Sequence, residues 1–357
     1  MKKLDFYILK ELAVPLLIGT VVIALLFVGN EFIFLFKQFE ISHVPPLVLI
    51  QLVILKIPSW LNLTLPVGVA MGSSLALSRL ARESELTAMR STGVPIRRVL
   101  LPVVIVAALV AVGNFYLVER VIPKASLANR KLMSEFFLLS AVPKFRSDVV
   151  IKLDRYSARF GSVRREDNGT LRLEDIVLFE SPKVDEVFIY KSKTGTYQDG
   201  VWRFTKPFVY NLVGTNLISG ASKDEIVINE QMQIADIFIP PDPSEETAAS
   251  LRRKIYEARR TGRVATVYEI AYYVKFTIPA SCVIFAITSA LMAVRMAKSG
   301  AFVGLLISLG LVILYYNIHI ISTEIVGRNG WLPPLWAAWL PNILYGLFGL
   351  FLLRRIE

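Results

Sequence analysis

Six long runs of apolar residues limit what this chain can fold into more than any other feature of its sequence. A helix that crosses a membrane needs roughly 20 mostly apolar residues. Runs of about this length or longer cover residues 12–36, 47–78, 99–122, 268–294, 301–325 and 335–353. In lipid, such a run satisfies its backbone polar groups by forming a helix. We therefore predict a polytopic membrane protein with six transmembrane helices.

The segment between the third and fourth apolar runs has a different pattern. Its apolar residues alternate with polar ones in period two, as in Leu171–Val177 and Val201–Phe204. Turn-forming residues such as Asp199 and Gly200 separate these stretches. Several short strands at this spacing predict an all-β domain, whether a sandwich, a jelly roll or a partly open barrel. The predicted order is three transmembrane helices in residues 1–122, the β-domain with a connecting helix in 123–267, and three transmembrane helices in 268–357.

The basic residues predict which side of the membrane each loop faces. Beside one set of helix ends stand Lys2, Lys3, Lys10, Arg79, Arg82, Arg90, Arg97, Arg98, Arg295, Lys298, Arg354 and Arg355. The short loops on the opposite side offer only Lys37 and Arg328. Since basic loops stay in the cytoplasm, both termini and the loop 79–98 are predicted to be cytoplasmic, with residues 123–267 outside. The net charge of +11 is scattered over helix ends, which argues against nucleic-acid binding.

One basic stretch, residues 252–263, falls on the predicted outer side. The rule for loop charges is weak after a long translocated domain, so the predicted orientation stands. We predict an interfacial helix whose basic face meets lipid headgroups. A helix that is merely solvated is the alternative.

The sequence lacks several motifs that carry catalysis or bind metals. It has no G-x-x-x-x-G-K-[ST] loop for ATP, no H-E-x-x-H and no C-x-x-C. Two histidines, His43 and His319, are too few for a histidine metal site, and the single Cys282 can form no internal disulfide. We therefore predict neither a catalytic site nor a metal site. Any work that the protein does must draw on a partner or an ion gradient.

The cytoplasmic segment 79–93 is the most informative part of the chain. It has the pattern of a short amphipathic helix with an apolar stripe formed by Leu80, Leu86 and Met89. Its charged residues are Arg79, Arg82, Glu83, Glu85 and Arg90. Gly93 and Pro95 then end the helix, as a C-cap glycine followed by proline does. Such a helix could dock into a groove of a cytosolic partner, and the alternative is a plain connecting helix on the bilayer.

Several charged residues lie within the apolar runs or near their ends, and four of them predict a function. Lys56 and Lys275 are well inside the second and fourth runs, and Glu31 and Lys37 lie toward the outer end of the first. Charges at membrane depth are costly and usually face a cavity or a partner. These four residues predict a polar path for an anionic amphiphile. The alternative is that they snorkel to the interface.

Two small-residue patterns predict close packing between helices. They are Gly68 with Gly72 in the second run, and Gly300 with Gly304 in the fifth. Small residues at this spacing let two helix backbones approach each other. The packing could be within the chain or against a second subunit.

The order of these features resembles a known family. Leu65 and Pro66 lead into a span that ends at Leu80, and the stretch Glu83–Met89 and then Gly93 follow. Together with the order of helices, β-domain and helices, this resembles the LptF/LptG (YjgP/YjgQ) permeases over essentially the whole chain. Those permeases are the membrane subunits of the lipopolysaccharide-exporting ABC transporter.

The resemblance implies a fold, partners and roles for residues. The β-domain would be a periplasmic jelly roll. Two permeases, LptF with LptG, would pair around a V-shaped cavity, driven by a cytosolic LptB ATPase dimer. The 79–93 helix would be the coupling helix that meets this ATPase, with Glu85 as its contact. The coupling residues would be Arg82, Glu83, Glu85, Leu86, Met89 and Gly93, and Lys37 would lie where basic residues meet the substrate's phosphates.

The resemblance also implies a task in the bacterial inner membrane. The chain would extract lipopolysaccharide, or a similar envelope lipid, and pass it to a periplasmic LptC/LptA-type bridge protein. It would bind no cofactor of its own, because the partner subunit binds ATP. A secondary transporter and a membrane-anchored scaffold or binding protein are the alternatives. The sequence leaves open whether the chain is of the LptF or the LptG type, and whether it pairs with itself or with a paralogue.

Overall fold

The computed structural model of the protein describes residues 2–38, 45–139, 149–152, 156–165, 170–183, 186–198, 201–213, 216–229, 242–260, 262, 264–296 and 301–356. Within these residues, six helices are long and apolar enough to cross a membrane. They are Lys3–Leu35, Pro46–Arg82, Ile96–Met133, Thr266–Arg295, Val303–Gly327 and Pro334–Ile356. All six overlap the predicted apolar runs. The chain divides into two compact units, which we describe separately.

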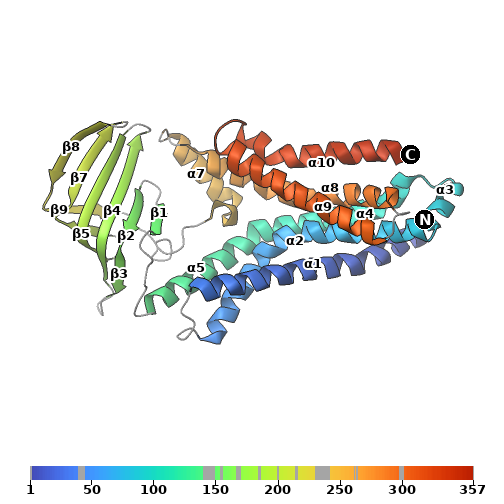
Figure 1. The fold of residues 1–357 in the computed structure, drawn as a ribbon, viewed down its shortest axis with the longest axis horizontal. Helices are drawn as coiled ribbons and strands as arrows, with labels where there is room; N and C mark the ends of the chain where they lie inside the picture. The colour runs from blue at the N-terminus through green and yellow to red at the C-terminus, as the bar shows by residue number, and fades with distance from the viewer. Residues whose placement is uncertain are drawn as a thin grey trace. The chain divides into compact units, whose positions relative to one another are not determined.

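The helical unit comprises Met1–Ser126, Pro243–Glu257 and Val264–Glu357. Its elements are α1 (Lys2–Gln38), α2 (Pro46–Arg82), α3 (Glu85–Ser91), α4 (Ile96–Tyr116), the π-helix η2 (Leu117–Val121), the start of α5 (Ile122–Leu139), the short helix η3 (Pro243–Glu245), most of α7 (Ala248–Arg260), α8 (Thr266–Arg295), α9 (Ala301–Ile320), the π-helix η5 (Ile321–Gly327) and α10 (Pro334–Ile356) (Figure 1). Pro58 and Pro66 lie inside α2, which remains one helix of 37 residues.

Helix α8 lies at the centre of this unit. Within its most apolar stretch, 67% of the residues are buried, against 22% for α1, α2 and α9. It packs against α2, α4, α9 and α10, and Cys282, Phe285 and Ala290 lie buried on it. The other helices keep apolar side chains on the outside, such as Leu17 and Leu25 of α1, which are each 62% exposed. Their surface therefore suits contact with lipid or with another apolar surface.

Helices α1 and α2 approach each other closely at two glycines of α2. A Cβ atom at Gly68 would overlap the hydroxyl oxygen of Thr20 and lie 2.9 Å from the Leu16 carbonyl oxygen. At Gly72 it would lie 2.9 Å from the side chain of Leu16. The predicted close packing at Gly68 and Gly72 is confirmed, and it occurs within the chain. Gly300, in the second predicted pair, lies outside the described residues.

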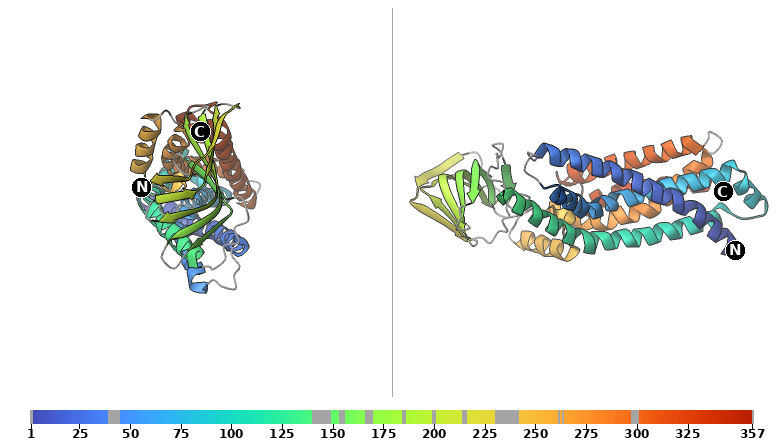
Figure 2. Two further views of the ribbon diagram at one scale, coloured as in Figure 1. Left: turned by 90° about the vertical axis from the view of Figure 1, so that its left-hand side faces the viewer. Right: turned by 90° about the horizontal axis from the view of Figure 1, so that it is seen from below.

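The second unit, Leu127–Asp242 with Ala258–Arg263, contains one curled antiparallel sheet (Figures 1 and 2). Its strands are β1 (Val149–Lys152), β2 (Tyr156–Phe160), β3 (Ser162–Arg165), β4 (Leu171–Lys183), β5 (Glu186–Gln198), β6 (Val201–Thr205), β7 (Phe208–Val213), β8 (Asn216–Ser222) and β9 (Glu225–Asn229). The strand order is β1-β2-β4-β5-β6-β9, with β3 also paired to β4, β7 to β5, and β8 to β7.

The alternating sequence explains the interior of this sheet. Leu173, Ile176 and Leu178 of β4 are buried, and so are Trp202 and Phe204 of β6. On β6 these two residues alternate with exposed or partly exposed ones, because neighbouring side chains of a strand point to opposite faces. Gln198 of β5 pairs with Val201 of β6, so two antiparallel strands flank the predicted turn at Asp199 and Gly200, which itself lies outside the described residues.

Candidate functional site

Helix α3 occupies the predicted cytoplasmic segment, but this segment does not form a single helix. Residues 79–82 are the last turn of α2, and α3 begins only at Glu85. Ser84 between them has a φ of 60°, in the left-handed region, so the chain turns there and cannot continue as an α-helix. At the far end, Gly93 has a φ of 85°, which glycine adopts without strain, and Pro95 precedes α4.

The apolar stripe of this segment faces the helical unit. Leu80 is completely buried and Leu86 is 4% exposed, and both belong to the core formed with α1, α4 and α8. Met89 packs against the same core. The exposed residues of the segment are Arg82, Glu83, Ser84, Thr87, Ala88 and Arg90. The segment is therefore anchored by one face and open on the other, as its amphipathic pattern predicts.

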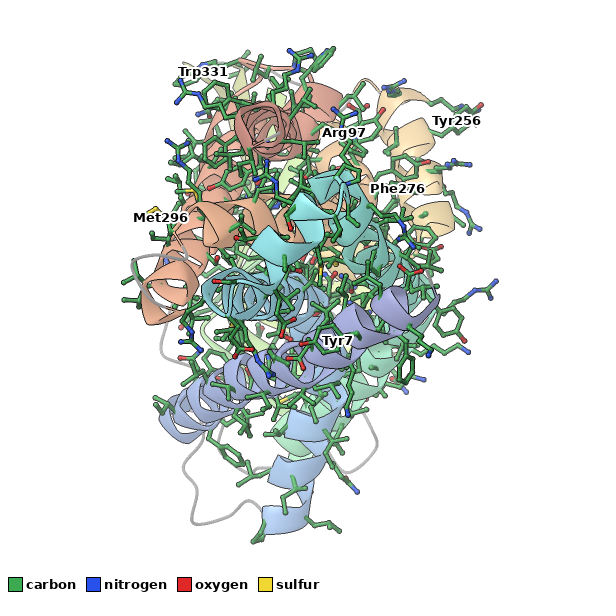
Figure 3. The ribbon with its side chains drawn as sticks, turned by 90° about the vertical axis from the view of Figure 1, so that its right-hand side faces the viewer. Tyr7, Arg97, Tyr256, Phe276, Met296 and Trp331 are labelled. Carbon is green, nitrogen blue, oxygen red and sulfur yellow. The ribbon has the colours of Figure 1, made fainter. Side chains whose placement is uncertain are left out.

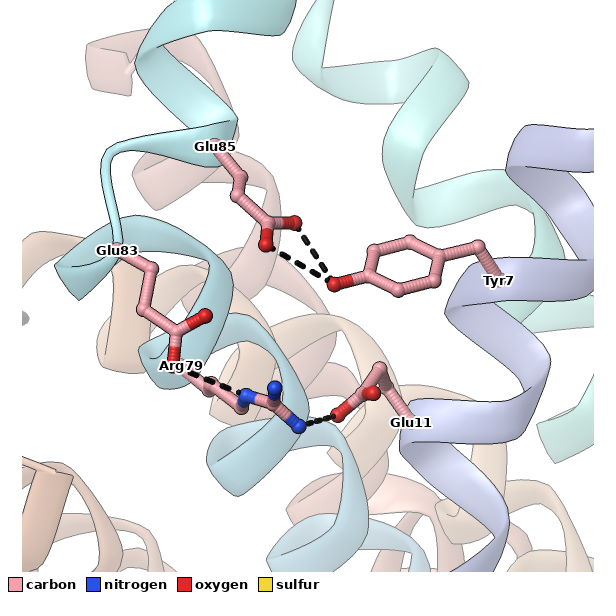
Figure 4. A network of polar contacts seen from close by, with 5 residues as sticks. All are labelled: Tyr7, Glu11, Arg79, Glu83 and Glu85. Carbon is pink, nitrogen blue, oxygen red and sulfur yellow. Dashed lines mark hydrogen bonds and ion pairs between the residues drawn. The ribbon is translucent and has the colours of Figure 1, made fainter.

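Glu85 is held by α1 (Figure 4). The hydroxyl of Tyr7 donates a hydrogen bond that the two carboxylate oxygens of Glu85 share, at 3.0 and 2.9 Å. Glu85 is only partly exposed, whereas its neighbours Ser84 and Thr87 are exposed. The residue predicted as the contact to an ATPase is thus also the link between α3 and the first transmembrane helix.

A second set of charges joins the end of α2 to α1. The guanidinium of Arg79 lies 2.5 Å from Glu11 and 3.1 Å from Glu83 (Figure 4). The side chain of Arg79 is 47% exposed and that of Glu83 is 41% exposed. Ion pairs in contact with water contribute little stability. This set therefore orients the end of α2 relative to α1 more than it stabilises the fold.

Two further arginines join helices at this end of the unit. Arg98 of α4 forms a two-pronged ion pair with Asp5 of α1, with both N–O distances at 2.7 Å. Arg90 of α3 donates to the carbonyl oxygen of Ile356, near the end of α10, at 3.0 Å. Figure 3 views the helical unit from this end, with Tyr7 and Arg97 marked. Side chains of α3 are therefore bonded to α1 and α10, and α4 is bonded to α1.

The residues predicted to form a polar path lie near the opposite end of α2 and on α8. The ammonium of Lys56 lies 3.3 Å from Glu245, and Glu31 is close enough to both to interact electrostatically. Lys275 lies on α8 and has other partners. It is 2% exposed, and its ammonium donates to the carbonyl oxygen of Val118 at 3.0 Å. Lys37 lies in α1, with a side chain outside the described residues.

Sequence reasoning missed two acidic residues in this region. Glu119 lies 3.6 Å from Lys275, and Glu245 binds Lys56 and the hydroxyl of Ser126. A signal for Glu119 was present, because it is a charge at the end of an apolar run with Pro123 four residues later. Among the described residues, no group of three or more histidine, cysteine or acidic side chains could hold a metal ion.

Six helices that are long and apolar enough to cross a membrane, among the residues that the structure describes, are the architecture of a multi-pass membrane protein. Residues 6–355 match the family described as lipopolysaccharide export system permease LptF/LptG. The chain therefore belongs to the LptF/LptG permease family, as the resemblance predicts. No curated protein matches the chain in sequence.

Proposed function

We propose that this chain is a permease subunit of an ABC transporter that extracts lipopolysaccharide, or a similar envelope lipid, from the bacterial inner membrane. Energy comes from a separate LptB-type ATPase dimer, which binds the ATP. The observation that carries the proposal is α3, whose apolar face is fixed in the helical core while its polar face is open. Together with membership of a lipopolysaccharide export family, this arrangement supports a site for an ATPase.

In this proposal α3 and the turn before it form the coupling element. Leu86 and Met89 fix it to the core, and Gly93 lets the chain turn sharply into α4. Arg82 and Glu83 are exposed and available to the ATPase. Glu85 has two tasks, because its carboxylate is held by Tyr7 and its remaining hydrogen-bonding capacity is open to a partner.

A transporter of this kind needs a second permease and a periplasmic acceptor. We propose that the spans are arranged three plus three, with both termini in the cytoplasm and the β-unit, a jelly-roll-like domain, in the periplasm. The exposed apolar faces of the spans suit pairing with a second LptF/LptG-type permease, either a copy or a paralogue. An LptC/LptA-type bridge protein then receives the lipid. The basic helix α7, with Tyr256 67% exposed and pointing outward (Figure 3), would lie at the outer headgroups.

The transport cycle is a rigid-body rearrangement between two states. The lipid enters laterally from the outer leaflet into the cavity between the two permeases, where Lys37 and Lys56 supply the cations of a polar path for its phosphates and Glu31 is the anionic neighbour of Lys56. Closure of the ATPase dimer pushes α3 and narrows the cavity. The acyl chains then move along the apolar interior of the β-unit, where Leu173, Trp202 and Phe204 lie.

The test is co-purification from detergent with the candidate LptB-type ATPase, followed by measurement of ATP hydrolysis. Glu85→Ala should lose the ATPase or uncouple its hydrolysis from lipid release. Tyr116→Phe is the control, because Tyr116 is an exposed residue of α4 outside the proposed ATPase site. If the native chain fails to retain the ATPase even with a second permease co-expressed, the proposal is wrong. A secondary transporter or a membrane-anchored scaffold would then explain the chain better.

A further inference from the structure

A proline leaves one backbone carbonyl without a donor at the end of α4. In an α-helix the carbonyl of Val118 would accept from the N–H of Ile122. That N–H donates instead to Leu117, five residues back, in the π-helix η2. The next residue is Pro123, which has no N–H to offer. The Val118 carbonyl must therefore find its hydrogen bond outside the helix ladder.

Lys275 of α8 supplies that hydrogen bond. Its ammonium donates to the Val118 carbonyl oxygen at 3.0 Å and lies 3.6 Å from the carboxylate of Glu119. The lysine side chain is only 2% exposed. A buried ammonium is costly unless it is paired and hydrogen-bonded. The two partners on η2 thus satisfy the lysine, and the lysine satisfies the carbonyl that Pro123 leaves free.

Glu119 also binds the chain where it returns to the helical unit. Its two carboxylate oxygens lie 3.1 and 3.0 Å from the backbone N–H of Ala248, the first residue of α7. A helix leaves its first N–H groups without internal partners, and a carboxylate is well suited to accept from them. One carboxylate therefore connects the outgoing segment η2, the returning helix α7 and, through Lys275, the central helix α8.

A second acidic residue repeats the arrangement close by. Glu245, just before α7, lies 3.3 Å from the ammonium of Lys56 on α2, and the hydroxyl of Ser126 on α5 donates to it. Glu245 is 17% exposed and Lys56 is 31% exposed. The chain leaves the helical unit after Ser126 and returns at Pro243. Both crossing points are thus tied to each other and to two spans.

We propose that Lys56, Glu119, Ser126, Glu245 and Lys275 form a stem joint, which makes the exit and return of the chain one element that moves with α2 and α8. This inference rests on the proposed function, because the movement comes from ATP-driven closure at α3. Lys275 and Glu119 are positioning residues of the transport cycle. They carry displacement of the spans to Ser126 and Pro243, where the chain leaves and re-enters the helical unit, and they touch no substrate.

The experiment measures the width of a spin-label distance distribution and lipid delivery in the same variants. Labels at Tyr256→Cys on α7 and Trp336→Cys on α10 occupy sites that are 67% and 56% exposed, and the native Cys282 is completely buried. Lys275→Met and Glu119→Gln should broaden the distribution. They should also lower lipid transfer to the bridge protein by about tenfold, while ATPase co-purification stays unchanged. Lys275→Arg, which keeps the cation, should restore both readouts.

The outcomes distinguish failure of the stem joint from failure of the proposed function. An unchanged distribution in Lys275→Met and Glu119→Gln overturns the joint, and so does full lipid transfer. If Lys275→Met fails to fold, Glu119→Gln and the milder Glu245→Gln carry the test. Failure of the native chain to retain the ATPase would defeat the proposed function. The spin-label arm, which uses the chain alone, would still decide whether the stem joint exists.

Discussion

The two ends of the helical unit use charged residues in opposite ways. Around α3 the charges are in contact with water, as with Arg79 at 47% exposed. In the stem joint, Lys275 is 2% exposed and donates to the Val118 carbonyl, for which Pro123 has no N–H to offer. Exposed pairs can be exchanged for a partner's groups at small cost, whereas breaking a buried pair leaves a charge without water. The α3 end is thus suited to docking, and the stem joint to holding a shape.

The sharpest test of this contrast removes the buried cation. Lys275→Met should lower the free energy of unfolding by about 3–5 kcal/mol, because Glu119 and the Val118 carbonyl lose their partner inside the protein. Thermal or denaturant unfolding in detergent measures the change. Lys56→Met is the matched variant in the same joint, and it should cost clearly less because Lys56 is 31% exposed. Equal losses from the two variants would contradict the contrast.

A substitution midway along α2 should disturb the α3 end and spare the stem joint. Gly68→Ala places a Cβ against Thr20 and Leu16 and should cost about 1–3 kcal/mol through overpacking. It should also move α1 away, so that Tyr7 loses Glu85. Unfolding in detergent and a cysteine crosslink between positions 7 and 85 measure the two effects.

The control for that variant is Gly113→Ala on α4, where a Cβ would have nothing within 4 Å. This change should leave both stability and the crosslink as they are in the parent. Comparable losses from Gly68→Ala and Gly113→Ala would mean that the approach of α1 and α2 does not set the geometry at α3.

Removal of one hydroxyl at the α3 end should affect coupling more than stability. Tyr7→Phe keeps the ring and frees the Glu85 carboxylate. We expect the ATPase to be retained and lipid transfer to fall by about two- to fivefold, because α3 loses its link to α1. Tyr116→Phe, at an exposed tyrosine of α4, is the control. If Tyr7→Phe transfers lipid at the parent rate, the role of Glu85 is limited to its contact with the ATPase.

The smallest effect is expected at the exposed ion pairs. Arg79→Gln should leave the unfolding temperature unchanged, since Arg79 and Glu83 are both in contact with water. Any effect on ATPase coupling should fade as salt is raised, because salt screens exposed charges. If the unfolding temperature drops clearly and the drop persists at high salt, Arg79 stabilises the fold in the same way as the buried charges of the stem joint, and the contrast fails.

Much of this fold could be predicted, because the signals for it are local. A run of apolar residues is readable wherever it stands, and all six runs are helices in the structure. The alternation around Val201–Phe204 likewise predicted β6, which pairs with β5 in the structure. The segment 79–93 was predicted as one helix and is divided at Ser84, since neither its apolar spacing nor its charges reveal a single left-handed residue.

The polar groups were harder to predict, because their partners are distant in the sequence. Lys275 was recognisable as a charge inside a span, but its partners lie 157 residues away at Val118 and at the neighbouring Glu119. That carbonyl needs a donor because η2 is a π-helix and the next residue, Pro123, has no N–H. The contact between Tyr7 and Glu85, 78 residues apart, follows similarly from the approach of α1 to α2 at Gly68.

The π-helix η2 has a consequence for the length of the chain. A π-turn contains about one residue more than an α-turn. Deletion of a single residue other than Glu119 between Leu117 and Ile122 would therefore let the ladder return to α-helical spacing, while the residues that follow keep about the same faces. Insertion of one further residue has no such compensation and would rotate everything that follows by about 100° around the helix axis. Ser126 would then point away from Glu245, although no residue of the stem joint had been changed. This stretch should accept a deletion of one residue better than an insertion, so its register is as much a part of the joint as its charges.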